Sequence, residues 1–188
     1  AAAIKGLGQF HDEESRATVI KYLQSKSFRN EIASAAITVI RQQGDAEYLP
    51  PLMDVLTRHE QAFPSKDFGR ALQTVAVVAE SLEEKSEVYG FLASYVNHPK
   101  TNVRTAALSA LGELGDRQAR SVLASCSDSS NQRIASAAQK ALTKLDESGL
   151  VVPREVVELR KAVTKMERES KQLKEDLKSL RERIETER

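Results

Sequence analysis

Residues 102–116 read NVRTAALSALGELGD, and this stretch decides the fold because the chain repeats it. A copy without gaps, EIASAAITVIRQQGD, occupies residues 31–45, and a shorter copy, RIASAAQKALTKL, occupies residues 133–145. A degenerate copy, RALQTVAVVAESL, lies at residues 70–82. The three clear copies start 71 and 31 residues apart, so the period is 31 to about 36 residues. Periods of this size are typical of repeat architectures, in which each repeat is one supersecondary unit.

The apolar residues of each copy follow helical spacing. In residues 102–116 they recur at i, i+4, i+7, i+8 and i+11, which places them on one face of a helix. They are Val103, Ala107, Ala110, Leu111 and Leu114. Paired alanines stand at one register in three copies, at residues 35–36, 106–107 and 137–138. We expect these small side chains to let a neighbouring helix approach closely.

Gly-Asp pairs end two of these helices, at residues 44–45 and 115–116. The glycine predicts a left-handed cap, and the aspartate predicts an N-cap for a following helix. Asp12 stands at the same register as Asp45 and Asp116. The position seven residues after these three aspartates is occupied by Val19, Leu52 and Leu123. The position ten residues after them is occupied by Tyr22, Val55 and Cys126. Both positions are predicted to face the core, so each repeat is predicted to be two antiparallel helices.

This pattern resembles the HEAT-repeat family in its short variant, and the residues that carry it are ALSALGELGD at 107–116 and its copies. The resemblance covers residues 1–146 and implies an all-α solenoid of about four helix-pair repeats. It implies little about activity, since solenoids of this family serve as scaffolds, cargo binders and enzyme appendages. Two departures occur in the second repeat, which ends in ESLEEK at residues 80–85 and has a longer inter-helix segment, HEQAFPSKD, at residues 59–67.

The start of the chain aligns to the middle of a repeat's second helix. We therefore expect a solenoid that is truncated at its N-terminus and belongs to a longer protein, since a repeat needs a neighbour to bury its apolar face. A native capping helix is the alternative.

The composition changes after a short linker at residues 147–153, and residues 154–188 read as heptads. The predicted seam consists of Val156, Leu159, Val163, Met166, Leu173, Leu177, Leu180 and Ile184, with Ser170 as a polar break. This pattern predicts a long coiled-coil helix, and the residue types favour two parallel strands. We expect a homodimer through this C-terminal helix. A single amphipathic helix that folds back onto the solenoid is the alternative.

The charges are nearly balanced, with 28 Lys and Arg against 27 Asp and Glu. A net charge of +1 gives no argument for a nucleic-acid or anionic membrane partner. No apolar run approaches the ~20 residues that span a bilayer. We therefore expect a protein partner, no nucleic acid and no membrane. The sequence leaves the localisation open, with a cytoplasmic location favoured.

No motif for catalysis, cofactor or metal binding is recognisable. His11, His59 and His98 are predicted to be solvated turn residues, because no ligand spacing surrounds them. His59-Glu60 begins like a zinc-protease HExxH motif, but Phe63 occupies the second histidine position. Cys126 is predicted to be a buried core cysteine and not a nucleophile. We expect no cofactor and no enzymatic activity in this chain.

A binding surface is more plausible than a catalytic one. Second helices line the concave wall of a solenoid, and the helical position opposite Val103 gives the solvent-facing row. That row comprises Lys5, Thr38, Arg41, Thr105, Ser109, Ser136 and Lys140. It is polar, mildly basic and without aromatic side chains, so a plain solvated face is the alternative. The segment at residues 59–67 is a second candidate surface, with an exposed spacer as its alternative.

The sequence favours a non-catalytic C-terminal region that scaffolds or oligomerises a larger protein. A HEAT-like region that ends in a heptad helix resembles the C-terminal extension of some large zinc aminopeptidases of the HExxH class, but no catalytic residue of that family can be carried over. The alternative function is a stand-alone adaptor that binds a protein through its concave face. A HEAT-type lyase or nucleic-acid enzyme is disfavoured by the near-neutral charge and the absence of Trp.

Overall fold

The computed structural model describes residues 4, 6–10 and 12–150, with side chains up to residue 147. The chain divides into two compact units, Ala1–Ser148 and Gly149–Arg188. Helices and turns make up the described residues, which contain no strand. The predicted coiled-coil seam lies outside the described residues, as do Lys5 and His11.

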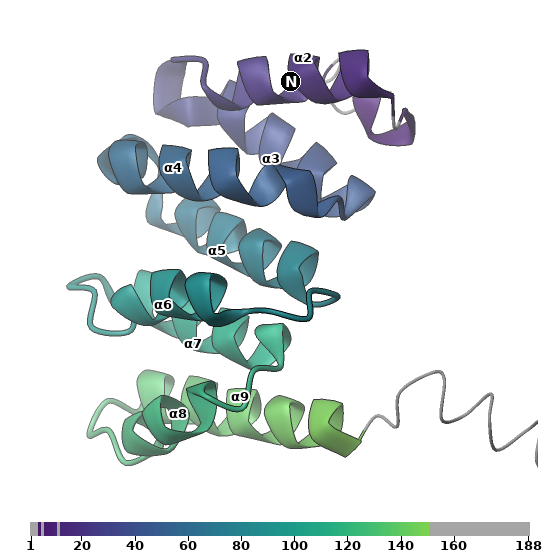
Figure 1. Ribbon diagram of the computed structural model, residues 1–188. Coiled ribbons are helices and arrows are strands. Elements are labelled where there is room, and N and C mark those ends of the chain that lie inside the picture. The colour runs from purple at the N-terminus through teal and green to yellow at the C-terminus, as the bar shows by residue number, and fades with distance from the viewer. Residues whose placement is uncertain (1–3, 5, 11, 151–188) are drawn as a thin grey trace, which may run out of the picture. The chain divides into compact units, whose positions relative to one another are not determined.

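The first unit consists of consecutive helix pairs. The first helices of the pairs are α2 (Glu13–Leu23), α4 (Leu49–His59), α6 (Ser86–Ser94) and α8 (Ala119–Ser127). The second helices are α3 (Glu31–Gln43), α5 (Ser65–Ala79), α7 (Thr101–Leu114) and α9 (Gln132–Leu150). Short 3-10 turns are η1 (Leu7–Gln9), η2 (Phe28–Asn30), η3 (Ala46–Tyr48) and η4 (Glu60–Ala62). The pairs stack in chain order, with first helices on one side and second helices on the other (Figure 1). This all-helical, solenoid-like arrangement has the predicted repeat register, and α9 continues into the predicted linker at residues 147–153.

The Gly-Asp turns have the predicted geometry. Gly44 and Gly115 adopt left-handed conformations, with φ of 65° and 70°, which glycine reaches without steric cost. The Asp45 carboxylate accepts the Glu47 N–H at 3.0 Å, and the Asp116 carboxylate accepts the Gln118 N–H at 2.8 Å. Each aspartate thus satisfies a free N–H at the start of the next helical segment.

The core lies between the two rows of helices and follows the predicted phase. All five apolar positions of α7 are buried, from Val103 to Leu114. Val19, Leu52 and Leu123 are also completely buried.

At the next predicted core position, Val55 is buried, but the expectation is wrong for the other two residues. Tyr22 is 36% exposed, and Cys126 packs against the core while remaining half-buried. The difference follows from position, because α4 lies between α2 and α6, whereas α2 and α8 belong to the first and last described pairs. A helix of a terminal repeat has a neighbouring repeat on one side only.

Glycines allow the second helices to approach one another. A Cβ atom built on Gly69 of α5 would lie 2.8 Å from the Ala106 Cβ of α7. One built on Gly112 of α7 would lie 2.7 Å from the Ala141 Cα of α9. Real Cβ atoms do not come this close, so both contacts require glycine at the present helix spacing. The predicted role of small residues holds, although the closest contacts use glycines that the alanine pattern did not indicate.

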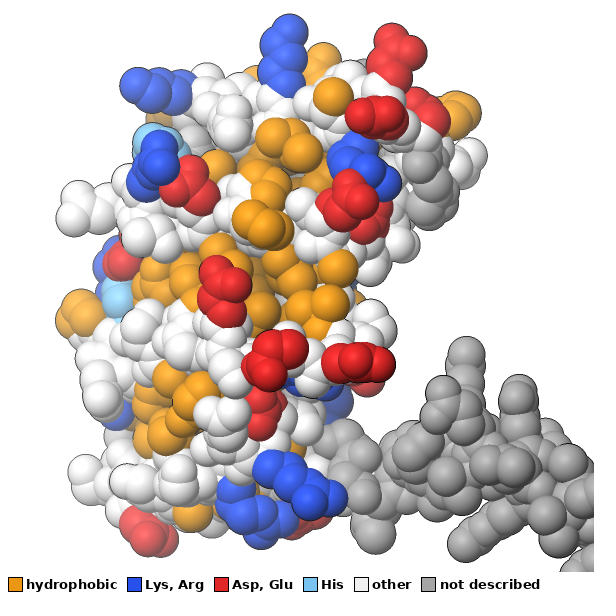
Figure 2. All heavy atoms as spheres, viewed as in Figure 1, with side chains coloured by type: hydrophobic (Ala, Val, Ile, Leu, Met, Phe, Trp, Pro, Cys, Tyr) orange, Lys and Arg blue, Asp and Glu red, His pale blue; other side chains and the backbone are white. Residues whose placement is uncertain are grey.

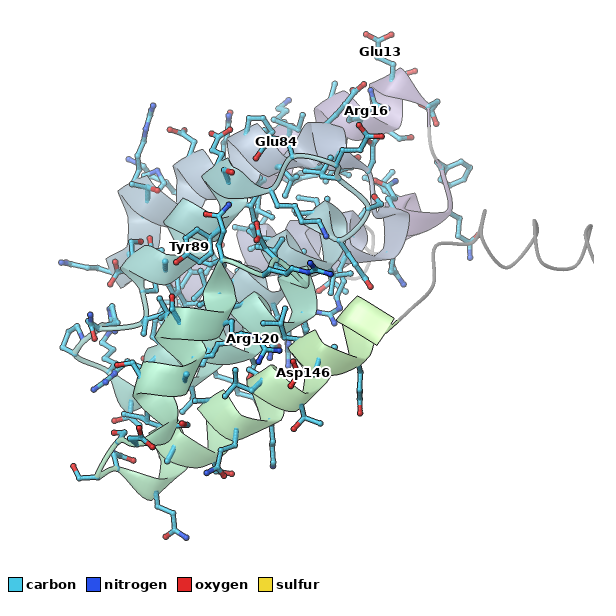
Figure 3. The ribbon with its side chains drawn as sticks, turned by 60° about the horizontal axis from the view of Figure 1, so that its bottom comes forward. Glu13, Arg16, Glu84, Tyr89, Arg120 and Asp146 are labelled. Atoms are coloured by element: carbon cyan, nitrogen blue, oxygen red, sulfur yellow. The ribbon has the colours of Figure 1, made fainter. Side chains whose placement is uncertain are left out.

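Polar contacts join the starts of first helices to the ends of second helices. Arg16 of α2 pairs with Asp45 at 2.8 Å and also with Glu47, while Arg120 of α8 pairs with Asp146 of α9. Figure 3 shows Arg120 and Asp146 close to one another. The Lys85 ammonium donates to the Leu114 carbonyl at 2.8 Å. Lys85 thereby satisfies a carbonyl at the end of α7, where the helix itself supplies no donor.

Candidate binding groove on the second helices

Two adjoining depressions form a groove along the second helices. The first lies between α5 and α7, the second lies between α7 and α9, and both are lined by Thr105 and Ser109. Their volumes are about 460 and about 510 Å³. The groove follows the N-terminal halves of α5, α7 and α9, whose register is fixed by the glycine contacts.

The groove is lined by cations, amides, hydroxyls and small residues. The cations are Lys66, Arg70, Arg133 and Lys140. The amides and hydroxyls are Gln73, Asn102, Gln132, Ser65, Thr105, Ser109 and Ser136. The small residues are Gly69, Ala106 and Ala137. Among the described residues, no Asp or Glu lines either depression.

The structure brings together part of the predicted solvent-facing row. Thr105, Ser109, Ser136 and Lys140 all line the groove. Thr38 and Arg41 lie on α3 and line neither depression, and the Thr38 hydroxyl donates to the Ser34 carbonyl at 3.0 Å.

Sequence reasoning missed the contribution of α5. Lys66, Arg70 and Gln73 line the groove, but the degenerate copy at residues 70–82 hid their equivalence to the predicted row. A signal was present, because these three residues stand at i, i+4 and i+7 on the side of α5 away from its buried residues, such as Leu72 and Val75.

Among the described residues, three of the four groove cations have no ion-pair partner. Lys66 and Lys140 have no ion-pair partner among the described residues. The Arg70 guanidinium lies 3.9 Å from the Asp67 carboxylate, a contact between partly exposed groups that screening by water weakens. Arg133 donates to the Asn102 side-chain oxygen at 3.0 Å, which links α9 to α7 without neutralising the charge.

The helix ends reinforce this positive potential. Each N-terminal half carries the positive end of its helix macrodipole, which attracts anions near the first turn. Beyond the groove, towards the C-terminal ends of α7 and α9, the Glu113 carboxylate of α7 lies 3.6 Å from the Lys144 ammonium of α9. The groove is therefore a local cationic zone on a unit whose total charge is nearly balanced.

The face formed by the first helices is different. Figure 2 views this face and shows hydrophobic side chains gathered over α4 and beside α6, with acidic side chains among them. Tyr89 of α6 and Val122 of α8 are partly buried hydrophobic residues. Glu80, Glu83, Glu84 and Glu87 follow α5 or begin α6.

The histidine prediction holds for His59, which is exposed, and is wrong for His98. The His98 side chain is only 9% exposed, with Nε2 2.7 Å from a Glu60 carboxylate oxygen. Its Nδ1 accepts the Lys100 N–H at 3.0 Å. This geometry assigns the proton to Nε2, which donates to Glu60. The His98 ring is covered because Glu60, the first residue of η4, contacts it from the preceding helix pair.

The segment at residues 59–67 is anchored to the core through Phe63, whereas four of its residues are exposed: His59, Gln61, Ala62 and Lys66. Phe63 is 3% exposed, and its ring centroid lies 6.2 Å from that of Phe68. Phe68 in turn contacts Tyr95 edge-on, with centroids 5.3 Å apart. Burial raises the pKa of the Tyr95 phenol. This segment therefore links the second and third helix pairs.

Searches for two other kinds of site gave no candidate within the described residues. They contain no group of three or more His, Cys, Asp or Glu side chains placed to hold a metal ion. None of their helices has the length and apolar character needed to cross a membrane.

Comparison with known families bears on the helices that form the groove. Residues 69–143 match HEAT repeats. The match runs from within α5 into α9 and thus includes all of α7. It agrees with the resemblance drawn from the ALSALGELGD block. No curated protein matches the chain, and the expected link to a zinc aminopeptidase finds no support.

Proposed function

We propose that this chain is a non-catalytic protein-interaction scaffold and that the groove along α5, α7 and α9 is its binding surface. The observation that carries the proposal is the groove itself, which collects four cations and seven hydrogen-bonding side chains on helices within or bordering the HEAT match. HEAT repeats commonly mediate protein interactions, so this match supports a scaffold role.

The construction of the groove suits recognition. Its side chains extend from helices that approach closely at Gly69 and Gly112, so their relative positions are set before a partner arrives. Preorganised groups lose less conformational entropy on binding than groups on a mobile loop. Cations, amides and hydroxyls can hold a partner's charged side chains and backbone, and the proposal assigns them no reacting group.

A second part of the proposal concerns residues 154–188, whose heptad pattern favours association of two copies. A homodimer would present two grooves and increase avidity for a partner with two binding segments. Light scattering on the full chain and on residues 1–152 tests this part. A dimer that becomes a folded monomer on truncation supports it, and a full chain that stays monomeric at high concentration contradicts it. The aminopeptidase link stays a prediction.

Site-specific photo-crosslinking tests the groove as the binding surface. A benzoylphenylalanine placed at Ser109, which lines both depressions, should yield discrete crosslinked partners in cells. The same group placed at Gly90 of α6, where a side chain has open space, is the matched control on the first-helix face. Equal crosslinking from both positions, or crosslinking from Gly90 alone, would contradict the proposal.

A further inference from the structure

We infer that the groove binds an extended acidic segment of a partner protein, with two clusters of Asp or Glu carboxylates about six residues apart. This inference rests on the proposed scaffold function and specifies the chemistry of the partner.

The groove is positively charged. The groove has four cationic side chains and no lining carboxylate among the described residues. Residues 1–152 contain 17 basic and 18 acidic residues, so the positive charge is local to the groove and not general. Complementary potentials of this kind steer partners and select against those of the wrong sign.

The cations lie on the two outer helices of the groove. Lys66 and Arg70 lie on α5, Arg133 and Lys140 lie on α9, and α7 between them contributes only uncharged side chains to the lining. Arg133 and Lys140 are seven residues apart, which is about 10 Å along a helix. This separation suits two separate carboxylates, one for each cation.

The spacing of the helices sets the length of the segment. Packed helices lie about 8–10 Å apart, so α5 and α9 are separated by about 16–20 Å across α7. An extended chain advances about 3.3–3.6 Å per residue, so about five to six residues cover this distance. Between the cations of α5 and those of α9 lie Thr105 and Ser109. The Thr105 hydroxyl donates to the Asn102 carbonyl at 3.1 Å and can accept an N–H from the backbone of the bound segment, and the Ser109 hydroxyl also faces it.

The lining also disfavours two other occupants. Stacking of nucleic-acid bases uses aromatic side chains, and none of the described lining residues is aromatic. An apolar helix would need large hydrophobic side chains in the groove, but its apolar lining residues are Ala106 and Ala137. The lining therefore fits a polar, extended and negatively charged segment.

Fluorescence anisotropy with synthetic peptides tests the inference on the full chain. The labelled probe EEGSGSEE places its glutamate pairs six residues apart, and GSEEEEGS has the same composition with contiguous glutamates. The spaced probe should bind more tightly than the contiguous one, and KKGSGSKK should not bind. Equal binding of the two acidic probes, or binding of the lysine probe, would overturn the inference. A version with phosphoserines that binds while EEGSGSEE does not would also overturn it.

Charge-removal variants locate the binding. The double variant Lys66→Gln/Lys140→Gln removes two groove cations that have no ion-pair partner among the described residues. It should weaken binding of EEGSGSEE by about tenfold or more, as expected for lost hydrogen bonds between charged groups. The matched control Lys21→Gln/Lys26→Gln removes the same charge from exposed residues of α2 and the following turn and should change binding less than about twofold. Circular dichroism confirms that both variants fold.

An equal loss in both variants would mean that net charge, and not the groove, attracts the probe. Failure of this inference is separable from failure of the scaffold function. Partners crosslinked from Ser109 together with no binding of EEGSGSEE would retain the scaffold and reject the acidic segment. Absence of both results would reject the groove itself.

Discussion

The first and second helices of the same repeats differ in length, packing and surface chemistry. α5, α7 and α9 have 15, 14 and 19 residues, whereas α4, α6 and α8 have 11, 9 and 9. The second helices meet through glycine and alanine, and their outer side is polar and cationic. The first helices leave partly buried hydrophobic side chains on their outer face.

The difference shows how packing inside a repeat array can control the surface outside it. A close contact at Gly112 fixes the distance between α7 and α9, and this distance sets the separation of Ser109 and Lys140 in the groove. No such contact exists at Gly90 of α6, where a Cβ atom would have no neighbour within 4 Å. The second helices are therefore expected to tolerate substitution less than the first helices.

The largest effect is expected in the core beneath the groove. Leu111 of α7 is completely buried, so Leu111→Ala should reduce the free energy of unfolding by about 2–5 kcal/mol through lost burial and a residual cavity. Val122→Ala on α8, where the side chain is only partly buried, should cost clearly less. Chemical denaturation followed by circular dichroism measures both. Similar losses in the free energy of unfolding would contradict the expectation that second helices tolerate substitution less than first helices.

Two glycine substitutions sharpen the comparison further. Gly112→Ala should destabilise the fold by about 1–3 kcal/mol, because the new Cβ atom would meet the backbone of Ala141. Gly90→Ala makes the same chemical change at an exposed position of α6 without a clash and should stabilise the fold by about 0.5–1 kcal/mol. Opposite signs in the same denaturation assay support the account. A gain at Gly112 would show that α7 and α9 can separate without cost.

A smaller effect is expected where Lys85 contacts the end of α7. Lys85→Met removes the donor to the Leu114 carbonyl and should cost about 1 kcal/mol, the usual net value of such a hydrogen bond. Lys66→Met, which removes a lysine without an ion-pair partner among the described residues, is the matched control and should leave stability nearly unchanged. Thermal unfolding compares the two variants. Equal melting temperatures would mean that water replaces the Lys85 contact fully.

Much of the helical phase was predictable from sequence, because the copies of residues 102–116 specify which face of each helix is apolar. The Gly-Asp turns were predictable for the same reason, since Gly44 and Gly115 stand at the position of each turn that needs a left-handed backbone. The errors occurred where a residue's surroundings depend on another repeat. Tyr22 and Cys126 share the register of Val55 but have a described helix pair on one side only, and His98 meets Glu60 from the preceding pair.

Part of the groove was also accessible from sequence. The row through Thr105, Ser109, Ser136 and Lys140 follows from helical phase alone. The α5 side required the structure, because the alignment of residues 70–82 was too weak to transfer the row to Lys66 and Arg70. The contacts at Gly69 and Gly112 were not predictable either, since a periodic pattern identifies a buried face and not the distance to the helix beyond it.

The central claim is that the second helices bind and the first helices support them. An amide-resolved NMR titration of the full chain with EEGSGSEE tests it most directly. The account predicts shift changes concentrated in residues 65–73, 102–109 and 132–140, which line the groove. Amides of α4 and α6 should stay unchanged. Changes centred on α4 and α6, with the groove unaffected, would contradict the account.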